Sequence, residues 1–413
     1  MKRVLCIGGG AAGLLAAGIA AENGAKVTVI ERNARPARKV MITGKGRCNV
    51  TNDCDTETFL AHVPTNPRFL HSALRRFSTE DICALLRRFG VETKVERGNR
   101  VFPVSDKAVD VVDALVMFAR TAGVTFEHGR VTELLMSNGR CVGAKTEDGR
   151  CFEADAVAVC TGGLSYPQTG STGDGFVLAL SAGHTVTECR PSLVPLCIRE
   201  YDCSQMQGLS LKNVTLKVTD TANGKVLFEE LGEMMFTHFG VTGPLVLSAS
   251  AHMRNMSPGR YVLSVDLKPA LHETVLSERL LRELHTHRNA SVMTMLGSLL
   301  PRSMVPVMAA RVGLKPTLPC HSVTKEQRLR LQSTLKDFRL TVEGFRPIAE
   351  AIVTAGGVNV KEIRASTMES KLCGGLYFAG EVLDLDAYTG GFNLQIAFST
   401  GAAAGYAMAA SDE

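Results

Sequence analysis

The alternation of apolar and polar residues is most regular at the start of the chain. Val4–Ile7 is a continuous apolar run of strand length, which is typical of a parallel strand covered on both faces. A glycine turn and an alanine-rich stretch of helical length follow, and the stretch ends at Asn23-Gly24, a common helix stop. Lys26–Ile30 is a second strand-like run, closed by Glu31. The pattern therefore predicts a βαβ unit.

The turn between the first strand and the helix, Gly8–Gly13, matches the pattern G-x-G-x-x-G. In dinucleotide-binding folds the first glycine makes the tight turn, the second lets the backbone approach a pyrophosphate, and the third lets helix and strand pack closely. The helix N-terminus offers unpaired N–H groups to the phosphates. Glu31 suits the ribose hydroxyls and would repel a 2′-phosphate. We therefore expect tightly bound FAD or NAD rather than NADP.

Beyond residue 120 the chain changes to short strands with hairpin turns at Asn138-Gly139 and Asp148-Gly149. A buried-type strand then covers Asp155–Cys160 and stops at glycines. Near the C-terminus, Gly374–Glu381 repeats this pattern, and Gly390-Gly391 opens a helix that runs towards Ala409. Two distant glycine-ended strands are expected to converge on the first nucleotide crevice.

The middle of the chain shows two other patterns. Leu211–Leu231 alternates like a strand pair around an Asn223-Gly224 turn, and Val275–Leu335 has helical spacing. We therefore predict an α/β protein with a discontinuous Rossmann-like domain over residues 1–190 and 346–413 that binds the dinucleotide, FAD or NAD. A β-rich insertion over 191–275 and a small helical cap over 276–345 would separate its two parts. The cleft between the insertion and the bound dinucleotide is expected to hold the substrate.

Charge adds one open question. The 413 residues are 45% hydrophobic and 21% charged, and the formal net charge is +5, too small for a general polycation. Basic residues are nevertheless concentrated: Arg32–Arg100 has 14 Lys/Arg against 7 Asp/Glu, and Glu278–Arg339 has 11 against 4. These stretches are either solvated helix faces or a phosphate-contacting rim, which would indicate a nucleic-acid substrate.

Cysteine and histidine patterns restrict the chemistry. Twelve scattered cysteines without a Cys-x-x-Cys pair favour a reducing, cytoplasmic location. Cys48 and Cys54 are spaced more widely than the pairs of flavin disulfide reductases, so a packed thiol is favoured over a dithiol relay. The ten histidines show no metal-ligand spacing, so we expect no metal. The apolar stretch after Arg3 is interrupted by glycines, and no membrane association is expected.

Several of these motifs together resemble known flavoproteins. The N-terminal fingerprint, Thr161-Gly162-Gly163 and Gly380-Glu381 look like the FAD-binding fold shared with fumarate reductase flavoprotein subunits. More closely, Thr43–Asn52 (TGKGRCNVTN) and Phe378–Asp384 (FAGEVLD) resemble the bacterial HI0933-like or YhiN-like flavoproteins. That family is described as NAD(P)/FAD-dependent oxidoreductases or aminoacetone oxidases. The resemblance covers nearly the whole chain.

The resemblance implies a set of FAD contacts. The glycine fingerprint and Glu31 would hold pyrophosphate and ribose, Val131 would present backbone groups to adenine, and a helix beginning near Phe392 would direct its positive end at the flavin N1/O2 side, where charge develops on reduction. The residues implied are Gly8, Gly10, Ala12, Gly13, Glu31, Arg32, Lys39, Gly44, Arg47, Asn49, Val131, Thr161, Gly162, Gly380, Glu381, Asp384, Gly391, Asn393 and Leu394.

The resemblance also implies an activity, an FAD-dependent oxidoreductase that reduces an activated C=C bond. The substrate would be a small-molecule enone or uridine in ribosomal RNA, giving dihydrouridine. Because no second G-x-G-x-x-G appears, NADH or NADPH would bind only transiently as hydride donor. His238 and Tyr388 are the candidate catalytic acids, although each also suits a buried structural role. An aminoacetone-type amine oxidase and a non-catalytic flavin-binding module are the alternatives.

Overall fold

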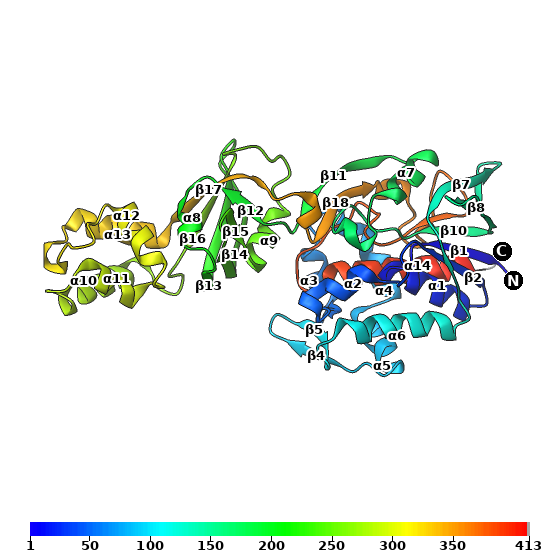
Figure 1. Cartoon of the computed structure of the whole chain (residues 1–413), viewed down its shortest axis with the longest axis horizontal. Helices are drawn as coiled ribbons and strands as arrows, with labels where there is room; N and C mark the ends of the chain where they lie inside the picture. Colours follow the sequence, from blue (N-terminus) through cyan, green and yellow to red (C-terminus); the bar gives the residue numbers. More distant parts are fainter. Residues whose placement is uncertain (411–413) are drawn as a thin grey trace. The chain divides into compact units, whose positions relative to one another are not determined.

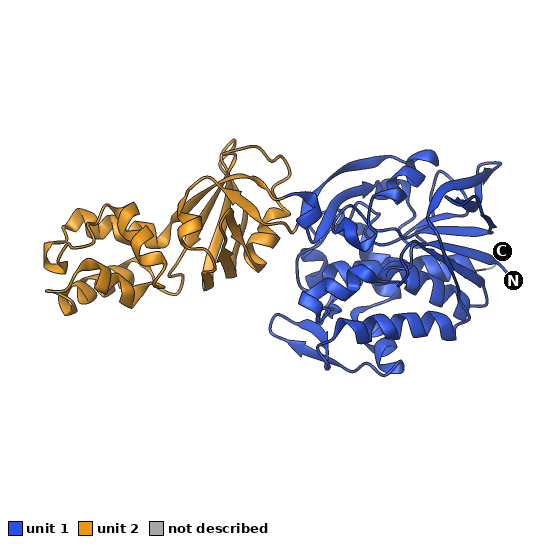
Figure 2. Ribbon diagram, in the orientation of Figure 1, with its two compact units in different colours: residues 1–192, 347–413 blue, residues 193–346 orange. Residues whose placement is uncertain are grey.

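A computed structural model describes residues 1–410 of the chain. The chain forms two compact units (Figure 2): unit 1 contains residues 1–192 and the residues from 347 on, and unit 2 contains residues 193–346. The predicted discontinuous domain, with limits at 190 and 346, differs from unit 1 by two residues at the first limit and one at the second. The two units are described separately below.

Unit 1 is built on a five-stranded parallel sheet in the order β19-β10-β1-β2-β6 (Figure 1). Its strands are Leu376–Phe378 (β19), Ala156–Val159 (β10), Arg3–Ile7 (β1), Lys26–Glu31 (β2) and Thr125–His128 (β6). All four residues of β10 and four of the five in β1 are buried. These two strands are therefore covered on both faces, which explains their continuous apolar runs.

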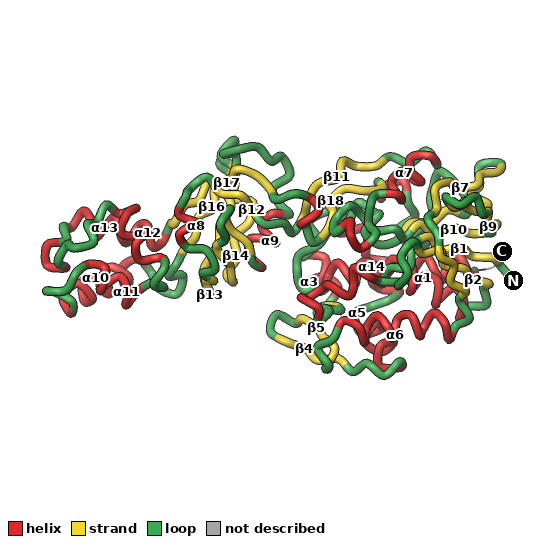
Figure 3. The backbone as a smooth tube through the Cα atoms, in the orientation of Figure 1, coloured by secondary structure: helices red, strands yellow, loops and turns green. Residues whose placement is uncertain are grey.

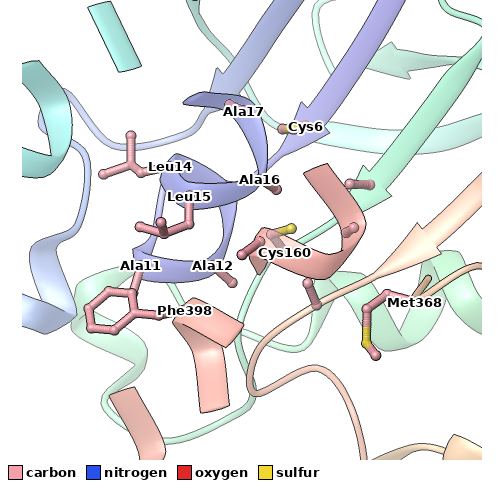
Figure 4. Packing of buried hydrophobic residues seen from close by; sticks show 14 of the residues in the cluster. Cys6, Ala11, Ala12, Leu14, Leu15, Ala16, Ala17, Cys160, Met368 and Phe398 are labelled. Atoms are coloured by element: carbon pink, nitrogen blue, oxygen red, sulfur yellow. The ribbon is translucent and has the colours of Figure 1, made fainter. Parts of the chain in front are cut away.

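Two helices pack closely beside this sheet. Helix α1 (Ala11–Glu22) and helix α14 (Phe392–Ala409) lie side by side in Figure 1, and Figure 4 shows Phe398 of α14 packed near Leu15 and Ala11 of α1. A Cβ added at Gly405 would approach the Ala16 carbonyl oxygen at 2.6 Å. The small residues of both helices therefore allow their backbones to come into contact, and both helices are buried over most of their surface.

The other helices of unit 1 are α2 (Arg38–Ile42), α3 (Thr56–Ala61), α4 (His71–Arg76), α5 (Thr79–Arg88), α6 (Ala108–Thr121) and α7 (Asp174–Ser181). Its antiparallel sheets are β3-β5-β4 (Thr51–Asn52, Arg100–Pro103, Thr93–Glu96), β7-β8-β9 (Val131–Ser137, Arg140–Thr146, Cys151–Glu153) and β11-β18 (Val186–Ser192, Val353–Val358). The β7-β8 hairpin turns at Asn138-Gly139, as predicted. Among the described residues, no helix is both long and apolar enough to cross a bilayer.

Unit 2 contains a closed barrel of strands in the order β12-β15-β14-β13-β16-β17, shown in yellow in Figure 3. The strands are β12 (Leu196–Ile198), β13 (Ser210–Asp220), β14 (Lys225–Phe236), β15 (Gly240–Thr242), β16 (Tyr261–Asp266) and β17 (Phe338–Phe345). The helices of this unit are α8 (Asp202–Gln205), α9 (Pro244–Ser250), α10 (Glu273–Thr286), α11 (Val292–Leu299), α12 (Met304–Val312) and α13 (Lys325–Lys336). The predicted turn at Asn223-Gly224 joins β13 to β14.

One predicted boundary is wrong. The sequence pattern predicts a helical cap that extends to residue 345, but its helices end at Lys336, and Phe338–Phe345 is strand β17 of the barrel. Phe338, Leu340 and Val342 are buried and alternate with more exposed neighbours, which is the period of a strand. Because β17 pairs with β16 and β12, the helical region is an insertion within the barrel rather than a segment after it.

Candidate functional site

A cavity in unit 1 lies at the carboxyl ends of the parallel strands, where ligands bind in folds of this type. It holds about 1340 Å³ including its open mouth, and all its lining residues belong to unit 1. The structure brings thirteen of the predicted FAD residues together in its wall, namely Gly8, Gly10, Ala12, Glu31, Arg32, Lys39, Val131, Thr161, Gly162, Gly380, Glu381, Asn393 and Leu394.

The glycine fingerprint forms one part of the wall, at the N-terminus of α1. Gly8 has φ +100°, and a Cβ there would approach the Cys160 carbonyl oxygen at 2.7 Å. A Cβ at Gly13 would overlap the Gly8 carbonyl, whereas one at Gly10 would have no protein atom within 4 Å. No side chain caps α1, and Ala11 and Ala12 of its first turn line the cavity, so N–H groups without an intrahelical partner lie at the cavity wall. Gly10 thus leaves open the space that a pyrophosphate requires.

Glu31 is buried beside this turn. One carboxylate oxygen accepts a hydrogen bond from the Gly9 N–H at 2.7 Å, and the other accepts from the backbone and side-chain nitrogens of Asn33, each at 2.7 Å. A carboxylate has about four acceptor positions, so Glu31 both orders the glycine turn and retains acceptor capacity on the cavity it lines. This arrangement suits the ribose hydroxyls.

A charged cluster lies at the same end of the cavity. Arg130 donates from Nε and Nη2 to the Asp174 carboxylate, each at 2.9 Å, and Arg32 Nη1 lies 3.2 Å from Asp174 Oδ2. Hydrogen bonding from Arg130 holds the pKa of Asp174 below its usual value. Arg32 also donates to the Thr172 hydroxyl at 2.6 Å. Asp174 therefore fixes both guanidinium groups beside Val131, the predicted adenine contact.

Four separate elements meet at Lys39. Its ammonium group donates to Glu381 Oε2 and to Ser165 Oγ, each at 2.6 Å. Ser165 Oγ and the Thr354 N–H in turn donate to Glu381 Oε1 at 2.7 and 2.9 Å. Lys39 and Glu381 both line the cavity, and an ammonium group has three N–H donors. The network accounts for two of them and leaves the third for a ligand.

The N-terminus of α14 forms the remaining part of the wall. No side chain of the helix caps it, and Asn393 and Leu394 in its first turn line the cavity. Asn393 uses its side-chain amide to bind the backbone of Ala387 and Tyr388 at 2.8–3.2 Å. The N–H groups of this first turn therefore fit the polar edge of a flavin ring.

Comparison with known proteins decides the family. The HI0933-like protein Rossmann domain matches residues 2–407. The chain belongs to this family. It is 31% identical over 413 residues to a 3-dehydro-bile acid delta(4,6)-reductase of Clostridium scindens, with 99% of each chain covered. It is 32% identical over 399 residues to a ribosomal RNA dihydrouridine synthase of Escherichia coli, covering 96% of this chain and 95% of the relative.

A solved structure shows the same fold. The 3-ketosteroid-delta4-(5alpha)-dehydrogenase from Rhodococcus jostii RHA1 matches 99% of this chain and 97% of its own, with 17% identity and a TM-score of 0.55. The family and the form of the cavity together identify this HI0933-like protein as an FAD-dependent oxidoreductase. Within the described residues, no group of three or more His, Cys, Asp or Glu side chains could hold a metal ion.

Six predicted FAD residues of the HI0933-like chain are not in the cavity wall: Gly13, Gly44, Arg47, Asn49, Asp384 and Gly391. Arg47 pairs with Glu96 and Asp106, and its guanidinium lies 4.2 Å from the ring centroid of Phe102. The side-chain nitrogen of Asn49 donates to backbone carbonyls, and its side-chain oxygen accepts a hydrogen bond from the Gly391 N–H at 3.1 Å. The Asn66 amide donates to the Asp384 carbonyl at 2.8 Å. These side chains hold loops beside the cavity.

The thiols next to this region are poor nucleophiles. Burial raises the pKa of Cys48 to about 12 and that of Cys54 to about 11, so almost none of either thiol is ionised at neutral pH. Both are free cysteines. This environment favours the packed-thiol interpretation of Cys48 over a dithiol relay.

The two predicted catalytic residues lie in different units of the HI0933-like chain. Tyr388 is half-buried in unit 1 and meets the ring of His62 edge to face, with ring centroids 5.5 Å apart. His238 is exposed in the turn between β14 and β15 of unit 2, edge-on to Phe239. Asn33 and Arg130 line the cavity, but no motif of the sequence marks either of them.

Proposed function

We propose that this protein is an NAD(P)H-driven reductase of a C=C bond conjugated to a carbonyl group. The observation that carries the proposal is the near-complete match to two relatives whose names describe related reductions, a bile-acid delta(4,6)-reductase and a dihydrouridine synthase. A 3-oxo-delta4 steroid and the uracil ring of uridine share this chemistry, since in each a C=C bond is conjugated to a carbonyl.

The conjugated carbonyl makes the β-carbon electrophilic and stabilises negative charge at the α-carbon. When bound, FAD supplies the hydride for such a reduction. The protein must orient the substrate, stabilise developing charge and provide one proton. The uncapped N-terminus of α14 in the cavity wall favours negative charge beside it. Tyr388 and His238 are the proton donors that the sequence suggests.

Anaerobic half-reactions test this function. NADH or NADPH should bleach the FAD absorbance of the purified protein, and a conjugated acceptor should restore it. The acceptors are 4-androstene-3,17-dione and a uridine-containing ribosomal RNA fragment, whose products are identified by mass. Bleaching by aminoacetone but not by NAD(P)H would instead indicate an amine oxidase. FAD that neither donor reduces would indicate a flavin-binding module.

The charge distribution favours RNA as a substrate worth testing beside the small molecules. In the basic stretch of unit 1, many side chains are already paired, among them Arg35 with Asp113 and Arg88 with Glu22. The helical region of unit 2 also has five exposed basic side chains to which the structure gives no acidic partner within 4.0 Å among the described residues. They are Arg282, Arg288, Arg302, Lys315 and Lys325. Such groups are suited to phosphate contacts.

A further inference from the structure

We propose that the ammonium group of Lys39 stabilises the reduced form of the bound flavin and so raises its reduction potential. This role belongs to the FAD site of unit 1 and does not depend on which acceptor the enzyme reduces. The family resemblance implies only that Lys39 contacts FAD, and no electronic role of the side chain follows from it.

The order of the strands puts the flavin half of FAD on the side of the cavity where Lys39 is bound. The predicted ribose contact, Glu31, ends β2, and the glycine turn that leaves room for the pyrophosphate follows β1. In the sheet order β19-β10-β1-β2-β6, a dinucleotide that runs from Glu31 across β1 continues towards β19. Glu381 follows β19, and its carboxylate accepts a hydrogen bond from Lys39 at 2.6 Å. Lys39 therefore lines the cavity at its flavin end.

Lys39 differs in position from the other cations of the cavity wall. Among the described residues, four Lys or Arg side chains line the cavity. Three of them lie on the ribose and adenine side, where they contact Asp174, beside the predicted adenine contact, or Asn33, which binds Glu31. These three are Arg32, Arg38 and Arg130. Lys39 is thus the cation that this wall offers to the flavin.

The hydrogen bonds around Lys39 leave a charged donor at the cavity. The ion pair with Glu381 is neutral as a whole, but its two members differ in what they can still offer to a ligand. Glu381 accepts from Lys39, from Ser165 Oγ and from the Thr354 N–H, which fills three of about four acceptor positions. Lys39 donates two of its three N–H groups, to Glu381 and Ser165. Its side chain is 22% exposed, and in such surroundings a hydrogen bond is stronger than in water.

Reduction changes the charge that this donor meets. A hydride from NADH or NADPH brings two electrons and one proton to the oxidised flavin and leaves NAD⁺ or NADP⁺, so the flavin ring gains one negative charge. A hydrogen bond between two charged groups is roughly twice as strong as one between neutral groups. Lys39 should therefore bind the reduced ring more tightly than the oxidised ring. This difference in affinity raises the reduction potential.

Four variants separate the charge of Lys39 from its packing. Lys39→Gln removes the charge and keeps N–H donors for Glu381 and Ser165, whereas Lys39→Met removes both. Lys39→Arg keeps the charge and is expected to behave like the wild type. Lys45→Met is the matched control, because Lys45 is exposed six residues further along the chain and is not among the residues that line the cavity.

The deciding measurement is the reduction potential of each variant at saturating FAD, titrated against a redox dye of known potential. At a given potential, Lys39→Gln and Lys39→Met should shift the ratio of reduced to oxidised flavin about tenfold towards the oxidised form, the factor expected for one charge-assisted hydrogen bond. This shift equals about 30 mV for two electrons. Lys39→Arg and Lys45→Met should stay close to the wild type.

Titration of FAD into the apoprotein gives a second readout without turnover. Lys39→Gln should weaken the binding of reduced FAD about tenfold more than that of oxidised FAD. Equal weakening of both forms, wild-type potentials in Lys39→Gln and Lys39→Met, or an equal loss of potential in Lys45→Met would overturn the proposal. Loss of all FAD binding in Lys39→Gln would also overturn it, because the side chain would then be needed to build the site.

Failure of the proposed function has a different signature. If the wild-type protein reduced no conjugated acceptor, the C=C reductase would be excluded. The potentials and FAD affinities of the Lys39 variants are measured without an acceptor, so they would still decide the role of Lys39.

Discussion

Gly10 and Gly13 belong to one motif but meet different surroundings. A Cβ at Gly10 would project into the cavity, and the backbone there (φ −79°, ψ −170°) is open to alanine. A Cβ at Gly13 would overlap the Gly8 carbonyl within the fold. We therefore expect Gly10→Ala to weaken FAD binding without lowering the melting temperature of the apoprotein. Gly13→Ala should lower both, with a loss of stability of about 1–3 kcal/mol, the usual range for overpacking.

Isothermal titration of FAD into each apoprotein and apoprotein melting curves check this pair. The comparison is internally controlled, because both variants add the same methyl group three residues apart. Unchanged FAD affinity in Gly10→Ala would show that no phosphate approaches this turn.

His184 should make the stability of unit 1 depend on pH. It is buried, with Nδ1 3.1 Å from Glu362 and Nε2 2.8 Å from the Ser370 hydroxyl, and burial lowers its pKa below the usual 6.5. The unfolded chain therefore binds a proton at a higher pH than the native chain does. Neutral His184 therefore makes its full contribution to the free energy of unfolding above pH 6.5. This contribution is lost as the pH falls through 6.5 towards the lower pKa of the native state.

Melting temperatures between pH 7.5 and 5.5 test this dependence. His184→Gln should cost about 1–3 kcal/mol at neutral pH because hydrogen bonds of the imidazole are removed. It should also flatten the acid-side decline relative to wild type. Parallel curves for the two proteins would show that His184 does not cause the decline.

At the scale of elements, the position of the N-terminus of α14 should affect the reduction potential of the bound flavin. Gly391 precedes the helix with φ +98°, and a Cβ there would overlap the Thr51 backbone. Gly391→Ala should displace the first turn from the cavity and lower the FAD reduction potential. A dipole contribution of about 0.3–2 kcal/mol corresponds to roughly 6–43 mV for two electrons. Gly183→Ala, where φ is +85° and the space is open, is the control, and equal potentials in both variants would contradict the idea.

The elements that sequence could predict are those with a local signal. The strands β1 and β2 and the hairpins at Asn138-Gly139 and Asn223-Gly224 follow from periodicity and turn residues. Strand β17 escapes prediction because its alternation directly follows a helical pattern. The site shows the same division: the glycine fingerprint is local, whereas Lys39 and Glu381 meet across 342 positions. The hydrophobic periodicity of a sequence cannot predict a contact between residues so far apart. Only the family resemblance indicates that these two residues belong to the site.

For the whole molecule, a test of substrate class follows from the fact that the cofactor cavity and five unpaired basic side chains belong to different units. All residues that line the FAD cavity belong to unit 1, and the unpaired basic side chains of the helical region belong to unit 2. Replacing Arg282 and Arg302 by alanine should therefore leave FAD content unchanged. If uridine in RNA is the substrate, the variant should bind ribosomal RNA fragments more weakly. Its salt slope should fall by about 0.7–0.9 for each phosphate that the variant no longer neutralises.

Filter-binding titrations at several salt concentrations measure this effect, with Arg330→Ala as the matched control because Arg330 already pairs with Glu326 at 3.0 Å. The dihydrouridine content of RNA from a deletion strain complements the binding data. RNA would be excluded as the substrate if its affinity did not change with salt concentration and the deletion strain kept its dihydrouridine content. A small conjugated ketone would then remain. The same double variant should then reduce 4-androstene-3,17-dione at the wild-type rate, because a neutral steroid gains nothing from exposed cations.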